Sequence, residues 1–220
     1  MGKKLEDILS GAAKRMGEPL NDRQLLLFST YYRELLVWNE KINLVSAKSP
    51  LDIPVKHFID SLTPLPFIPK LSLRLLDIGT GAGFPGIPLK IARPALKVSL
   101  LESSRKKTSF LKHMIRSLEL EDITVIHDRV EHVMEDDRYA DNFDVVISRA
   151  AFKLPDILRI SSFFLDDNGT VIAMKGKNIA LEGDAAVTSN RWGLTPVACH
   201  EIRLPVTGDV RKIMLFKKGF

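Results

Sequence analysis

The stretch LLDIGTGAGFPG, residues 75–86, predicts a buried apolar strand that runs directly into a loop rich in glycine. Glycine accepts positive φ angles and lacks a Cβ, so this backbone can turn sharply at the strand end and approach a ligand closely. Open α/β sheets bind their ligands at the carboxyl ends of parallel strands. We therefore expect an α/β protein whose ligand site is built around this loop.

Short apolar runs alternate with helical stretches after the loop. The clearest predicted helix covers residues 105–120, where Phe110, Met114 and Leu118 lie on one face. Such alternation predicts a parallel sheet that helices cover on both faces and that right-handed crossovers connect. The predicted parallel strands are residues 74–78, 98–102, 123–126, 143–148 and 170–174.

Two further apolar runs follow near the end of the sequence, at residues 194–202 and 211–217. Only the turn-rich sequence PVTGD separates them, so they are predicted to pair antiparallel. The chain should therefore hold a mostly parallel seven-stranded sheet that ends in an antiparallel hairpin. This is the layout of a Rossmann-like class I methyltransferase.

A helical extension precedes the sheet. Asn21 and Gln24 match the pattern of a capping box, and apolar residues at helical spacing behind them predict a helix that ends near Trp38. Residues 5–16 form a weaker amphipathic stretch. We expect the apolar side of this extension to pack on the main domain.

The length of 220 residues suffices for one well-buried domain with a small appendage. A proline-rich segment at residues 64–69 interrupts any helix there and marks a junction. We therefore predict an N-terminal helical cap at residues 1–66 and a main domain at residues 67–220.

The composition narrows the class of protein. A net charge of +5 suits a polyanionic partner such as nucleic acid without requiring one. Cys199 is the only cysteine, which excludes an internal disulfide and a cysteine zinc cluster and favours the reducing cytoplasm. No apolar run approaches the roughly 18 residues of a membrane span. We expect a cytoplasmic protein with no membrane partner.

The glycine loop matches the patterns of two cofactor sites. Residues 77–83 read D-x-G-x-G-x-G, the acidic glycine motif of S-adenosylmethionine-dependent methyltransferases. Residues 81–86 read G-x-G-x-x-G, the fingerprint of dinucleotide-binding proteins. Glu102 ends the next strand and would bind ribose hydroxyls in either case. The glycines alone do not separate the two cofactors.

Two neighbouring features favour S-adenosylmethionine. Asp77 places a carboxylate beside the loop, which suits a cationic sulfonium and repels a pyrophosphate. Pro85 lacks the N–H that a pyrophosphate site takes from a helix start. A tight turn that binds nothing is the remaining alternative. Residues 128–131 follow the third strand, where the main chain of Val130 and Glu131 is placed to contact an adenine.

The sequence restricts the chemistry of the methyl acceptor. Residues 148–150 read SRA, whereas enzymes that methylate exocyclic amines carry an Asn/Asp-Pro-Pro-aromatic run at this point. Methylation of pyrimidine carbon 5 needs a cysteine nucleophile, and Cys199 lies in an apolar run that predicts a small core residue. An acceptor that is already nucleophilic remains, such as N7 of a purine.

Several side chains are candidates for holding such an acceptor. Arg149 is predicted to bind the cofactor or the target nucleotide, with a salt bridge as the alternative. Lys175 and Lys177 follow the fifth strand and would meet phosphates unless they lie in a solvated loop. His57 and Asp60 share a helix face as a hydrogen-bonded pair, and no third ligand completes a metal site.

The chain resembles a known family along its central part. The motifs that carry this resemblance are WNEKINLVSA, HFIDSL, DIGTGAGFPGIPL, FDVVISRA and MKGK, in this order. They resemble the RsmG family, also called glucose-inhibited division protein B, of bacterial 16S rRNA methyltransferases. FPGIPL, residues 84–89, is the most specific of these pieces.

The resemblance implies methylation of N7 of a guanine in 16S rRNA, with S-adenosylmethionine as the donor. It makes 16S rRNA or the small ribosomal subunit the partner. We expect residues 67–220 to form the methyltransferase domain and the protein to be a monomer. The implied cofactor contacts are Gly79, Phe84, Val130, Glu131 and Arg149, beside Asp77, Gly81 and Glu102 from the residue analysis. The alternatives are an NAD-dependent oxidoreductase and a non-catalytic RNA-binding or assembly factor.

Overall fold

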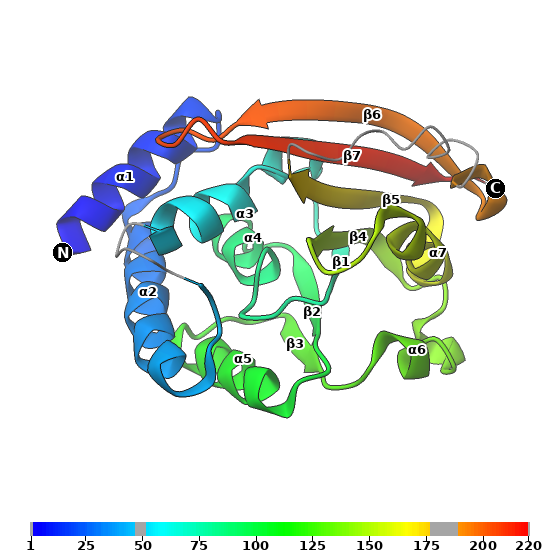
Figure 1. Ribbon diagram of the computed structural model, residues 1–220, viewed down its shortest axis with the longest axis horizontal. Helices are drawn as coiled ribbons and strands as arrows, with labels where there is room; N and C mark the ends of the chain where they lie inside the picture. The colour runs from blue at the N-terminus through cyan, green and yellow to red at the C-terminus, as the bar shows by residue number, and fades with distance from the viewer. Residues whose placement is uncertain (1, 47–51, 177–188, 220) are drawn as a thin grey trace.

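Seven strands form one sheet in a computed structural model that describes residues 2–46, 52–176 and 189–219 (Figure 1). Their order is β3-β2-β1-β4-β5-β7-β6. The strands are β1 Arg74–Ile78, β2 Lys97–Leu101, β3 Ile123–Ile126, β4 Phe143–Arg149, β5 Leu165–Gly176, β6 Leu194–Arg203 and β7 Val210–Lys218. Strands β1 to β5 pair in parallel, and β7 pairs antiparallel with both β5 and β6. The predicted mostly parallel sheet with a C-terminal antiparallel hairpin is confirmed.

Strand β5 is longer than its predicted core at residues 170–174. It begins at Leu165, directly after helix α7 ends at Phe164, and its pairing with β4 shifts register between Phe143 and Val145. The added residues include two aspartates, an asparagine and a glycine, which interrupt the apolar pattern. Because apolar content signals strands in a sequence, this polar first half was not predicted.

Helices cover both faces of the sheet. The helical elements are α1 Gly2–Arg15, α2 Asp22–Ile42, the π-helix η1 Pro54–Ile59, α3 Asp60–Leu62, the 3₁₀ turn η2 Leu65–Phe67, α4 Gly86–Ala92, α5 Arg105–Ser117, α6 Val130–Val133, the 3₁₀ turn η3 Asp137–Tyr139 and α7 Leu154–Phe164. Leu75 packs in one core with α1, α2, α4 and α5, while its neighbour Leu76 packs in a second core with α6 and α7. Side chains of successive strand residues point to opposite faces, so each strand here serves two cores.

The N-terminal helices share the first of these cores. Fully buried Leu9 of α1 and Phe28 of α2 belong to the same cluster as Val98 and Leu100 of the sheet. Helix α1 lies beside the turn of the β6–β7 hairpin, and α2 runs beside α5 (Figure 1). The apolar side of the extension packs on the main domain, as the sequence predicts. None of the described helices is long and apolar enough to cross a membrane.

Helix α2 begins at the predicted capping box. The Asn21 side chain accepts a hydrogen bond of 2.9 Å from the Gln24 amide, and the Gln24 side chain accepts one of 2.9 Å from the Asn21 amide. The helix ends at Ile42, later than the predicted end near Trp38. Asn43 stops it there by adopting a left-handed conformation with φ of 47°, a role that asparagine fills at helix ends.

We expect Asn21→Ala to destabilise the protein by about 1 kcal/mol, because the helix-start amide of Gln24 loses its partner. For a chain of this size, that loss corresponds to a melting temperature about 2–4 °C lower, measurable by circular dichroism. Asn21→Ser is the control, since serine also caps helices and should retain most of the stability. Equal melting temperatures for the alanine variant and the wild type would show that the capping box contributes nothing.

Cys199 is exposed on β6, so the prediction of a small core residue is wrong. Strand β6 lies at the end of the sheet and pairs only with β7 among the described strands. Pro196 and Val197 beside it are exposed as well. An apolar run predicts burial only where a helix covers it, and neither described core contains residues 195–203 as buried members.

Candidate functional site

The glycine loop joins β1 to α4 at the carboxyl edge of the sheet. The amides of Gly79 and Thr80 donate to the Leu101 carbonyl of β2 over 2.9 and 3.2 Å. Gly79, Gly81 and Gly83 have φ angles of 71°, 61° and 94°, a region that side chains disfavour. The backbone therefore makes the sharp turn that the sequence predicts.

Asp77 lies beneath this loop and is fully buried. One carboxylate oxygen, Oδ2, accepts hydrogen bonds from the Thr80 hydroxyl at 2.5 Å and from the Gly86 amide at 2.8 Å. Burial raises the pKa of Asp77 to about 6, although both hydrogen bonds act in the opposite direction. The carboxylate thus ties together the two ends of the loop and leaves a negative charge directly under it.

Glu102 follows β2 and lies beside the loop. Its carboxylate accepts hydrogen bonds from the Gly81 amide at 3.0 Å and from the Ser104 amide at 2.8 Å. Both contacts hold the side chain in one orientation at the edge where α/β proteins bind nucleotides. Glu102, which is predicted to bind the ribose, therefore also restrains the middle of the glycine loop.

Val130 and Glu131 follow β3 at the same edge of the sheet. They are the first residues of the short helix α6 rather than part of a plain loop, and Arg129 precedes them as the N-cap. Val130 is buried in the second core, whereas Glu131 is exposed. The residues that follow β1, β2 and β3 and are predicted to contact the cofactor therefore all lie at the carboxyl edge of the sheet. They are Gly79, Glu102, Val130 and Glu131.

Phe84 of the glycine loop is surrounded by aromatic side chains from the N-terminal segment. Tyr31 of α2 stacks on its ring with a centroid distance of 5.6 Å, and His57 of η1 stacks on it at 5.1 Å. Phe58 lies 5.9 Å away, and the Arg149 guanidinium stands 5.1 Å from the ring centre. Phe84 therefore contributes packing and a cation–π contact.

Arg149 lies at the end of β4 and connects this aromatic cluster to a carboxylate. Its guanidinium donates to Asp60 Oδ2 at 3.3 Å, to His57 Nδ1 at 3.1 Å and to the Lys56 carbonyl at 3.2 Å. The predicted salt bridge is therefore present, and it lies within the candidate site. The side chain is 17% exposed.

His57 and Asp60 both contact Arg149, which differs from the predicted pairing with each other. Residues 54–59 form a π-helix, so the spacing from His57 to Asp60 differs from that of an α-helix. Burial, and then the positive charge of Arg149, lower the pKa of His57 to about 4. The imidazole is neutral at pH 7, so Nδ1 accepts from Arg149 and the proton resides on Nε2.

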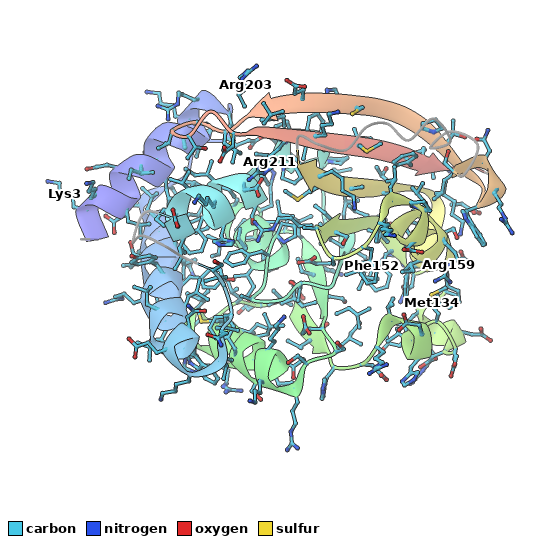
Figure 2. The ribbon with its side chains drawn as sticks, in the orientation of Figure 1. Lys3, Met134, Phe152, Arg159, Arg203 and Arg211 are labelled. Carbon is cyan, nitrogen blue, oxygen red and sulfur yellow. The ribbon has the colours of Figure 1, made fainter. Side chains whose placement is uncertain are left out.

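Asp60 has a second basic partner that no motif of the sequence predicts. Arg211 of β7 donates to Asp60 Oδ1 at 3.0 Å across 151 positions of sequence. Figure 2 shows Arg211 where the C-terminal hairpin meets the segment of α3. Two guanidinium groups share one carboxylate, so Asp60 keeps a charged partner when either arginine is removed.

Lys175 is directed to the protein rather than to solvent, so the solvated-loop alternative is wrong for it. Its ammonium donates to the Phe152 carbonyl, and burial lowers its pKa. Phe152 lies in the loop after β4 (Figure 2), and this loop approaches Gly79: a Cβ on Gly79 would be 2.6 Å from the Cβ of Ala151. Lys175 thus holds the loop after β4 close to the glycine loop. Lys177 lies outside the described residues.

Solved structures with this fold are methyltransferases and proteins of related architecture. M. jannaschii TYW2, solved in complex with AdoMet, superposes with a TM-score of 0.57 at 19% identity, covering 72% of this chain and 74% of that one. A TehB-like SAM-dependent methyltransferase from Corynebacterium glutamicum gives a TM-score of 0.54 at 16% identity, covering 87% and 96%. At these identities the likeness establishes the fold alone, the Rossmann-like methyltransferase fold that the sequence predicts.

Sequence relatives are considerably closer. Ribosomal RNA small subunit methyltransferase G of Syntrophus aciditrophicus is 48% identical over 210 residues, which cover 94% of this chain and 87% of that protein. The protein of the same name from Acetivibrio thermocellus is 38% identical, covering 98% and 89%. The GidB family model, described as rRNA small subunit methyltransferase G, matches residues 24–194. That span contains the glycine loop, Glu102 and Arg149. Because the family model and these relatives match most of the chain, the chain belongs to the rRNA small subunit methyltransferase G family.

Proposed function

We propose that this protein transfers a methyl group from S-adenosylmethionine to N7 of a guanine in 16S rRNA. One observation carries the proposal: the glycine loop, Glu102 and Arg149 meet at one sheet edge inside the region that the family model matches. The dinucleotide alternative fits less well, because the buried Asp77 charge beneath the loop opposes a pyrophosphate.

The residues present fit this cofactor. S-adenosylmethionine supplies a methyl group bound to a positively charged sulfur. Glu102 would accept hydrogen bonds from the ribose hydroxyls, and the backbone of Val130 and Glu131 would contact the adenine. The loop from Gly79 to Phe84 would lie against the cationic part, and the negative charge of Asp77 beneath the loop would be favourable there.

Arg149, His57 and Asp60 would hold the guanine. N7 carries a lone pair and no proton, so the reaction needs an oriented acceptor and no general base. Neutral His57 and the Arg149 guanidinium form a rigid, hydrogen-bonded corner beside Phe84, which suits that task. Lys175 would act through the loop that it holds at Phe152.

We further propose that residues 1–66 act as a helical cap on a methyltransferase domain of residues 67–220. The cap supplies His57, Asp60 and the aromatic residues around Phe84, while the main domain supplies the cofactor edge. The protein would act in the cytoplasm as a monomer on 16S rRNA or the small ribosomal subunit. Its net charge of +5 is favourable for a polyanionic substrate.

The decisive experiment incubates the protein with labelled S-adenosylmethionine and small subunits or 16S rRNA that lack the modification. Mass spectrometry of the digested RNA should find 7-methylguanosine at one position. Its absence from naked RNA, precursor and assembled subunits alike would refute the proposal. Tighter binding of NAD than of S-adenosylmethionine in calorimetry would favour the oxidoreductase, and RNA binding without cofactor affinity would favour an assembly factor.

Cofactor affinity should depend on pH through Asp77. Its pKa of about 6 in the free protein should fall when a cation binds nearby, because the cation favours the carboxylate. As far as Asp77 is concerned, affinity is therefore nearly constant above about pH 7 and decreases below pH 6, with Kd rising roughly tenfold per pH unit until the pKa of the complex is reached. Calorimetry between pH 5 and 8 measures this, and Asp77→Asn should flatten the profile. A wild-type Kd that does not change between pH 5 and 7 would contradict it.

A further inference from the structure

Tyr31 of α2 contacts the glycine loop from outside the sheet. Its hydroxyl donates a hydrogen bond to the main-chain carbonyl of Ala82, in the middle of the loop. The side chain is fully buried, and this burial raises its pKa well above the usual value, so the hydroxyl stays protonated and remains a donor.

The same side chain touches the next two residues of the loop. A Cβ on Gly83 would lie only 2.7 Å from the Tyr31 hydroxyl, so the absence of a side chain at Gly83 makes room for Tyr31. Its ring stacks on Phe84 with an interplanar angle of 19° and packs against Phe58 at 5.1 Å. Three consecutive loop residues therefore depend on one side chain of the helical cap.

Other hydrogen bonds to the loop come from carboxylates at the sheet edge and from the Thr80 carbonyl within the loop. Asp77 holds Thr80 and Gly86 at the two ends, and Glu102 holds Gly81. Tyr31 holds the segment between them, at Ala82. A carbonyl that loses such a partner in a buried site can regain one only if the backbone rotates, and Ala82 is itself buried.

We infer that Tyr31 is a positioning residue for cofactor binding: it fixes the Ala82 carbonyl and the Phe84 ring, and so couples helix α2 to the affinity of the loop for S-adenosylmethionine. This inference rests on the proposed cofactor. It assigns the helical cap a part in donor binding, in addition to the part that His57 and Asp60 play on the acceptor side.

The test measures binding of S-adenosylmethionine and S-adenosylhomocysteine to Tyr31→Phe by calorimetry. Loss of one buried hydrogen bond should raise Kd about fivefold to tenfold for both nucleosides. In turnover assays, KM for the cofactor should rise, while kcat at saturating cofactor and KM for RNA stay within about twofold. Tyr139→Phe, which removes a hydroxyl on the α6 side of the sheet, is the matched control and should leave Kd unchanged.

A purely structural role gives a different result. It lowers the melting temperature of Tyr31→Phe and leaves Kd within about twofold of the wild type, which would overturn the inference while the proposed cofactor stands. Failure of the wild type to bind either nucleoside would overturn both. Tyr31→Met is the second variant: it keeps an apolar side chain but loses both the hydrogen bond to Ala82 and the stacking on Phe84, so a larger rise in Kd than for Tyr31→Phe is expected.

Discussion

Arg149→Ala is expected to lower kcat/KM for methylation of 16S rRNA by at least about 100-fold, because a misplaced acceptor loses the in-line geometry of the reaction. The guanidinium binds His57 Nδ1, Asp60 and the Lys56 carbonyl, and it stands over Phe84. Alanine removes all four contacts, including the hydrogen bond to His57 Nδ1 that helps to orient the imidazole. The loss should appear mainly in kcat, with KM for the cofactor changing less.

The variant should nevertheless keep its fold. Breaking a buried ion pair is costly when a charge is left alone, about 3–5 kcal/mol. Here Asp60 retains Arg211 at 3.0 Å, so its charge remains compensated. Arg149→Lys should recover little activity, because a single ammonium cannot contact His57 and Asp60 together as the guanidinium does.

Arg74→Ala provides the matched control for Arg149→Ala. Arg74 also forms ion pairs, with Asp144 and Asp166, but it lies at the start of β1, the end opposite the glycine loop. Its removal should leave kcat/KM unchanged. Steady-state kinetics and circular dichroism on both variants decide the matter. If Arg149→Ala is unfolded, or is folded with wild-type turnover, the role of Arg149 is that of a structural salt bridge and not of a residue that orients the acceptor.

Much of this fold is encoded locally and was therefore predictable. Strand β1 matches its predicted bounds of residues 74–78, and α2 begins at its capping box. Short apolar runs and capping residues are signals within a few positions of each other, so one sequence suffices to read them. The same holds for the edge of the site, because parallel strands bring their carboxyl ends together.

The contacts that complete the site are not local. Arg211 reaches Asp60 across 151 positions, and Tyr31 reaches Ala82 across 51. Neither residue lies in a motif with its partner, so spacing carries no signal of either contact. The prediction that Cys199 is buried is wrong for a related reason. Its burial depends on whether a helix covers β6, and the composition of that strand does not reveal this.

Gly81→Val should raise the Kd for S-adenosylmethionine by more than about tenfold, since a β-branched residue in left-handed conformation costs roughly 1–3 kcal/mol and the loop will relax away from it. Gly81 has φ of 61°, and its amide donates to Glu102. Relaxation of φ breaks that hydrogen bond and displaces the carboxylate that would bind the ribose. The substitution therefore acts on the loop and on Glu102 together.

Gly17→Val separates this effect from a general loss of stability. Gly17 also has positive φ, 75°, and a Cβ at either glycine would meet no atom within 4 Å, but Gly17 lies between α1 and α2. Both variants should melt at lower temperature by similar amounts because both store similar backbone strain. Only Gly81→Val should weaken cofactor binding in calorimetry, with Gly81→Ala intermediate. If the Kd of Gly81→Val equals that of Gly17→Val, the cofactor does not bind at this loop.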